Sequence, residues 1–133
     1  MRYRILRIGV LLWLVGTAAI RLAGQRLLHS GRPYATLILY LISFLLMALL
    51  APRIFRRVGV QKDSWPAAAT LLMLPTLILD PFSCVFFTTV FSNVEPGAAG
   101  VFGGWMLICC AGVVVGVWVS PGLRPEVESG VKA

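Results

Sequence analysis

Four long blocks of apolar residues follow one another along the chain, with charged and turn-forming residues between them. A helix that crosses a hydrocarbon core of about 30 Å needs about 20 mainly apolar residues, because each residue adds about 1.5 Å. The pattern therefore predicts an all-α, polytopic membrane protein, a four-helix transmembrane bundle formed by a single domain over residues 1–133. The expected spans lie at about residues 5–23, 34–51, 67–91 and 98–119, followed by a polar tail over 120–133.

The first block is the shortest of the four. Its uncharged core runs from Ile8 to Ile20, which is close in length to the apolar core of a secretory signal peptide. Arg21 stands where the cleavage region would begin, and no small-x-small cleavage site follows it. We therefore expect a transmembrane helix in which Arg7 and Arg21 extend toward opposite headgroup layers. A cleaved signal peptide is the alternative.

Prolines mark several expected ends and interruptions of the helices. Pro52 closes the second block, and Pro66 is suited to the first turn of the third helix. Pro75 and Pro81 lie inside the third block, where each removes one backbone hydrogen bond and presses on the carbonyl four residues earlier. A kink or a break near residues 77–81 is therefore expected.

Composition and charge agree with a membrane protein. Hydrophobic residues make up 59% of the chain and charged residues only 13%, far from the balance of soluble domains. The net charge is +7, yet the 12 basic residues flank the apolar blocks and form no continuous basic domain, so we expect lipid headgroups as partners and no nucleic acid.

The basic residues also predict the orientation, because cytoplasmic loops carry an excess of Lys and Arg. Three of them, Arg21, Arg26 and Arg32, lie on one side of the predicted membrane, and both termini are expected on the other, cytoplasmic side. The residues on that side are Arg2, Arg4, Arg7, Arg53, Arg56, Arg57, Lys62, Arg124 and Lys132.

Signals for catalysis are missing. Cys84, Cys109 and Cys110 all lie in apolar blocks and form no C-x-x-C pair, which disfavours the four-helix, quinone-linked disulfide oxidoreductases of similar size. His29 is the single histidine and has no second metal ligand nearby in the sequence. No P-loop, H-E-x-x-H or G-x-S-x-G motif is present. We expect no enzyme activity, no cofactor and no metal.

Asp80 is the one acid deep inside an apolar block. An ionised carboxylate at the centre of a bilayer costs about 2.5–3.5 kcal/mol, so it needs a partner, water or a proton. Counted at 1.5 Å per residue from Ala67, Asp80 lies at a height of about 20 Å, and Arg21 counted from Ile5 lies at about 24 Å. The matched heights predict an ion pair between the first and third helices.

Other polar residues share helix faces with these two. Three sets have spacings that place their members on one face, and all fall in the outer halves of their spans, which predicts a polar cleft open to the outside. The alternative is that these side chains only dock helices against one another. The sets are Thr76, Asp80 and Ser83; Thr17, Arg21 and Gln25; and Thr36, Tyr40 and Ser43.

The last block is rich in glycine. Gly100 and Gly104 form one G-x-x-x-G motif, and Gly112 and Gly116 form a second. Such spacing lets helix backbones approach closely. Packing within one chain is the preferred interpretation, and a homo-oligomer is the alternative.

The layout resembles small bacterial four-helix inner-membrane proteins of a family whose function is unknown. The resemblance rests on residues 11–18 with Arg21, on residues 74–83 and on residues 102–105. It implies a bacterial inner-membrane location and the four-helix architecture, but it supplies no activity.

Two functions are consistent with these observations. The first is a non-enzymatic structural role or an accessory role in a larger membrane complex. The second is a small transporter or permeation unit that uses Asp80. Small multidrug transporters share the size and the helix count, but their signature acid lies on the first helix, where this chain has no Asp or Glu.

Overall fold

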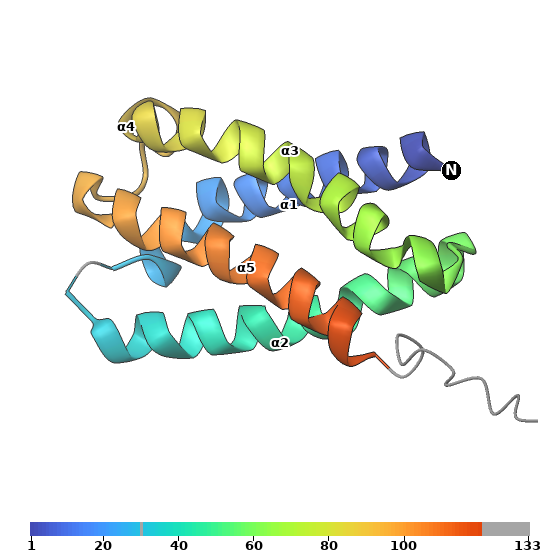
Figure 1. Cartoon of the computed structure of the whole chain (residues 1–133). Coiled ribbons are helices and arrows are strands. Elements are labelled where there is room, and N and C mark those ends of the chain that lie inside the picture. Colours follow the sequence, from blue (N-terminus) through green and yellow to red (C-terminus); the bar gives the residue numbers. More distant parts are fainter. Residues whose placement is uncertain (30, 121–133) are drawn as a thin grey trace, which may run out of the picture.

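The protein is a bundle of four long helices, seen in a computed structural model that describes residues 1–29 and 31–120 (Figure 1). Each long helix, alone or with the short 3-10 turn before it, is long and apolar enough to cross a membrane. This confirms the predicted all-α, four-span architecture, while the predicted tail from residue 121 onward lies outside the described residues. The long helices are α1 (Arg2–Leu27), α2 (Pro33–Val58), α3 (Trp65–Val85) and α5 (Ala99–Val119), and the short elements are η1 (Lys62–Ser64), α4 (Phe87–Val90) and η2 (Pro96–Ala98).

The long helices form two parallel pairs that are joined in the middle. α1 packs along α3, α2 packs along α5, and α3 and α5 pack against each other, so that α1 and α2 lie on the outside of the arrangement (Figure 1). The amino terminus and the end of α5 lie at the same end of the bundle. Successive helices therefore cross the bundle in opposite directions.

The second helix continues past the proline that was expected to end it. α2 runs through Pro52 to Val58 and stops at Gly59, which adopts a left-handed conformation with φ of 77°. Glycine tolerates this conformation because it has no Cβ. The expectation that Pro52 terminates the helix is wrong, because loss of one hydrogen bond inside a helix can be tolerated when a neighbouring helix covers the freed carbonyl.

The third helix is also unbroken across its prolines. α3 contains both Pro75 and Pro81 and ends at Val85, after which Phe86 separates it from α4. The interruption therefore lies beyond residues 77–81. The predicted span of 67–91 corresponds to α3 and α4 together.

Close approach between α2 and α5 depends on glycines of α5. A Cβ added to Gly112 would meet the Phe44 carbonyl, and one added to Gly116 would meet the backbone of Ala48. The Ala48 carbonyl is the one that Pro52, four residues later, leaves without its helical donor. A Gly116 Cα–H beside this carbonyl offers a weak replacement contact.

The other two motif glycines of α5 differ in their surroundings. Gly104 lies under the hydroxyl of Tyr40 on α2, whereas a Cβ added to Gly100 would meet nothing within 4 Å. Three of the four motif glycines thus lie against α2 of the same chain, whereas Gly100 lies on the exposed side of the first turn of α5.

The buried side chains form two separate clusters near opposite ends of the bundle. One cluster, near the amino terminus, is centred on Phe55 and Trp65, whose rings meet edge to face at 5.9 Å. The other cluster contains Phe87, Phe91 and Phe102, whose ring centroids lie 4.9–5.8 Å apart. Between these clusters the bundle is less tightly filled.

Replacing Gly116 with alanine should destabilise the fold by about 1–3 kcal/mol, because the new methyl group would overlap the Ala48 backbone. Unfolding of the purified protein in mixed detergent and SDS, followed by tryptophan fluorescence, measures this change. Gly100→Ala is the matched control, since its methyl group meets nothing and alanine favours the helix by about 0.5–1 kcal/mol. Equal stability of Gly116→Ala and the wild type would contradict the assigned contact.

Candidate binding cavity

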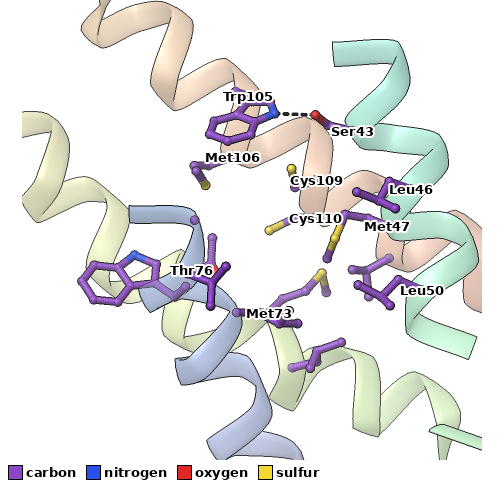
Figure 2. A pocket seen from close by; sticks show the side chains of 16 residues that line it. Ser43, Leu46, Met47, Leu50, Met73, Thr76, Trp105, Met106, Cys109 and Cys110 are labelled. Atoms are coloured by element: carbon purple, nitrogen blue, oxygen red, sulfur yellow. Dashed lines mark hydrogen bonds between the residues drawn. The ribbon is translucent and has the colours of Figure 1, made fainter. Parts of the chain in front are cut away.

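A cavity of about 240 Å³ lies in the middle of the bundle, between the two buried clusters. All four long helices contribute to its wall (Figure 2). Its lining residues are Leu12, Trp13, Val15, Gly16, Ser43, Leu46, Met47, Leu50, Leu72, Met73, Thr76, Trp105, Met106, Cys109, Cys110 and Val113.

The wall is apolar and rich in sulfur. It contains every methionine of the chain except Met1, and two of the three cysteines. Figure 2 shows the sulfur atoms of Met47, Met73 and Cys110 turned toward the space. Methionine side chains are flexible and polarisable, so they adapt to apolar ligands of different shape.

Only two hydroxyl-bearing residues belong to this wall, Ser43 and Thr76. The hydroxyl of Ser43 accepts a hydrogen bond of 2.6 Å from the indole Nε1 of Trp105 (Figure 2). This bond joins α2 to α5 and occupies the polar group at that end of the cavity. What remains for a ligand is chiefly hydrocarbon and sulfur surface.

The cavity has an opening between α1 and α2, where two of its lining residues are exposed. Val15 of α1 is 66% exposed and Leu46 of α2 is 58% exposed. A Cβ on Gly16, another lining residue, would meet nothing within 4 Å. The edge of the cavity at this opening is therefore apolar.

The size and polarity of the cavity limit what it can hold. Apolar cavities of about 150 Å³ stay dry and accept molecules the size of benzene, whereas drug-sized ligands need about 300–1,000 Å³. A volume of about 240 Å³ lies between these ranges. It fits a small apolar molecule or one segment of a longer hydrocarbon chain.

Asp80 lies outside this cavity. It is 7% exposed and accepts a hydrogen bond of 2.8 Å from Nε1 of Trp13, which joins α3 to α1. Its second carboxylate oxygen is buried and has no hydrogen-bond partner among the described residues. The carboxyl group also borders a groove of about 210 Å³ between α3 and α5, together with Thr76, Cys84 and Gly103.

The predicted ion pair between Arg21 and Asp80 is wrong. A guanidinium nitrogen of Arg21 donates to the carbonyl of Val90, at 2.6 Å. Asp80 on α3 is bonded to Trp13 of α1, 67 positions earlier, and Val90 on α4 is bonded to Arg21, 69 positions earlier. Arg21 therefore lies eight residues beyond the level of Asp80, or about 12 Å along the helix.

Most of the remaining predicted polar residues bond to a neighbouring helix or to a carbonyl of their own chain segment. The Tyr40 hydroxyl donates to the Val101 carbonyl at 2.7 Å, and Gln25 accepts from Asn93 at 2.7 Å. Ser83 and Thr36 each donate to the carbonyl four residues earlier. Of the predicted site residues, Ser43 and Thr76 line the cavity, and Thr17 lies half-buried on α1.

Three residues that carry important contacts were absent from the sequence-based set. Trp13 and Trp105 each donate an indole N–H to an acceptor inside the bundle. Asn93 bridges to α1 through the Ile20 carbonyl and Gln25. The usable signal was that Trp13 and Trp105 lie well inside apolar blocks, where an indole N–H needs an acceptor.

Within residues 1–29 and 31–120, no group of three His, Cys, Asp or Glu residues is placed to hold a metal ion. The cysteines in this part of the chain are free thiols and half-buried.

Comparison with known proteins adds a family. The model of a family of unknown function (DUF5367) matches residues 27–122, which include α2, α3 and α5 and leave nearly all of α1 outside the match. No curated protein and no solved structure matches this chain.

The contact between Trp13 and Asp80 predicts a specific pattern of stabilities. Trp13→Phe and Asp80→Ala should each destabilise the protein by about 1–3 kcal/mol, because each removes one end of a buried hydrogen bond. The double variant should lose no more than the larger single loss, since the two changes remove the same bond. Denaturation in SDS gives all four free energies.

Asp80→Asn is the matched control for this cycle. Its amide oxygen can still accept from Trp13, so we expect a loss below about 1 kcal/mol. If Asp80→Asn is as damaging as Asp80→Ala, or if the two single losses simply add, the bond does not dock α1 on α3.

Proposed function

Because the chain belongs to DUF5367, a family of unknown function, its role has to be inferred from its own geometry, and we propose that it is a non-enzymatic, accessory membrane protein that holds a hydrocarbon segment of a bilayer-dissolved molecule. The observation that carries the proposal is the apolar cavity of about 240 Å³ beside the opening between α1 and α2. A segment of an acyl or isoprenoid chain has the polarity and width that such a space accepts.

The hydrogen bonds that the polar side chains make between helices support this proposal. Trp13, Tyr40 and Trp105 each donate across a helix interface to an acceptor on a neighbouring helix. The donors and acceptors of these three bonds therefore hold neighbouring helices together. The cavity itself offers apolar contacts and adaptable sulfur-bearing side chains, which suit binding by shape and dispersion rather than a chemical reaction.

We further propose that the protein resides in the bacterial inner membrane with both termini in the cytoplasm. The excess of basic residues at the amino-terminal end and at the carboxyl-terminal end of α2, where Arg53, Arg56 and Arg57 lie, supports this orientation. Alkaline phosphatase should be active when fused after Gly31 and inactive when fused after Gln61, because this enzyme matures only outside the cytoplasm. The reverse activities would refute the orientation.

A second candidate function, a small transporter or permeation unit, is favoured by one observation. Asp80 borders the groove between α3 and α5, and its second carboxylate oxygen is buried without a partner in the part of the chain that the structure describes. A proton or a cationic group could occupy that position. Proton flux into proteoliposomes distinguishes the two candidates: flux in the wild type that Asp80→Asn abolishes at unchanged stability would support transport.

Cross-linking with a photoreactive lipid tests the cavity. The purified protein in vesicles of phosphatidylcholine with a diazirine-bearing acyl chain should be labelled at Met47, Met73 and Cys110, which line the cavity. Cys110→Phe should reduce labelling at the two methionines at least about fivefold, because the larger side chain occupies space that the acyl segment would take.

Leu41→Phe is the matched control, because Leu41 is 60% exposed on α2 and is absent from the cavity wall. It adds an aromatic ring on the lipid-facing surface and should leave labelling of the cavity unchanged. Labelling that is equal in the wild type and Cys110→Phe, or confined to exposed residues, would refute the proposed function.

A further inference from the structure

A second hollow lies on the side of the bundle where α2 meets α5. This groove has a volume of about 420 Å³ and shares no lining residue with the central cavity. It is lined by Phe44, Leu45, Ala48, Leu49, Pro52, Arg53, Arg56, Val115, Gly116, Val119 and Ser120. Its lining is apolar along most of its length and basic at one end.

Two arginines form the basic end. Arg53 donates to the Leu49 carbonyl at 3.3 Å, and Arg56 donates to the Ser120 hydroxyl at 3.2 Å while its guanidinium carbon lies 5.9 Å from the centre of the Trp65 ring. These contacts use one donor of each guanidinium, which has five. Both side chains are exposed, and none of the described residues that line the groove is acidic. The site is therefore complementary to an anion.

The length of the apolar part matches one leaflet. From Arg53 to Phe44 the groove follows nine residues of α2, or about 14 Å. Half of a hydrocarbon core of about 30 Å is about 15 Å. An acyl chain lying along Leu45 and Leu49 would thus place its headgroup beside the arginines.

The floor of the groove follows from the close contact between its two helices. Gly116 lies against the backbone of Ala48, and the pyrrolidine ring of Pro52 stands beside this contact. Because the Ala48 backbone occupies the place that a side chain at position 116 would take, the two backbones close the floor of the groove. Val115 and Val119 then form the wall on α5.

We propose that this groove binds one anionic glycerophospholipid, with its phosphate between Arg53 and Arg56 and one acyl chain along the face between α2 and α5. The site is separate from the central cavity. Loss of lipid binding at this site would therefore not contradict the proposed function of the cavity, and the reverse also holds. Its ligand is selected by headgroup charge, whereas the cavity selects for hydrocarbon.

Native mass spectrometry tests this site with phosphatidylglycerol and phosphatidylcholine of identical acyl chains, added to the protein in a neutral detergent. The wild type should retain one phosphatidylglycerol in preference to phosphatidylcholine. Arg53→Gln and Arg56→Gln should each weaken phosphatidylglycerol binding about fivefold and together about 30-fold, because each removes one charge near the phosphate.

Arg57→Gln is the matched control: Arg57 is exposed on the same turn of α2 but does not line the groove. It should change binding less than about twofold, and Cys110→Phe in the cavity should leave binding unchanged. Glycerol 3-phosphate at the same concentration should not compete, since it has no acyl chain. Equal effects of all three arginine variants, equal retention of both lipids, or competition by glycerol 3-phosphate would overturn the proposal.

Discussion

Inside a bilayer the hydrophobic effect does not drive helices together, because lipid tails are as apolar as the side chains they would replace. Docking here depends on close backbone approach and on hydrogen bonds between helices. In the pair of α1 and α3, Gly9 lies against the Leu72 carbonyl, and Trp13 donates to Asp80. In the pair of α2 and α5, Gly112 and Gly116 take the role of Gly9. Each outer helix is thus fixed to one inner helix.

This docking scheme explains the shape of the interior. Since α1 and α2 are held by different partners, the two pairs are joined mainly through α3 and α5 in the described part of the chain. Bulky aromatic side chains fill the two ends, with Trp65 at one and Phe102 at the other. The middle is lined chiefly by Leu, Val, Met and Cys side chains together with the rings of Trp13 and Trp105, and these leave a cavity. The binding space is therefore a consequence of how the pairs dock.

The sequence predicted the number of helices and their approximate ends well, because block length in an apolar chain is controlled directly by bilayer thickness. The sequence did not predict the register of α1 and α3, that is, which residue of α1 lies beside which residue of α3. Counting from Ile5 and Ala67 assumed a difference of 62 residues between paired positions, whereas the hydrogen bonds show 67 at Asp80 and 69 at Arg21. A shift of about five residues is about 8 Å, enough to replace an ion pair with two unrelated contacts. Register depends on side-chain fit, such as Gly9 against Leu72, which periodicity does not encode.

Pro52 shows how one residue can affect docking and the outer surface together. Within α2 it leaves the Ala48 carbonyl without a helical donor, and that carbonyl lies where α5 has only the Gly116 backbone. A larger residue at 116 would meet the Ala48 backbone and push the helices apart. The walls of the groove between α2 and α5 therefore depend on the same close contact. Because the helix continues past Pro52, Arg53 and Arg56 lie on the same helical surface as Leu45 and Leu49, so charge and apolar lining belong to one rigid element.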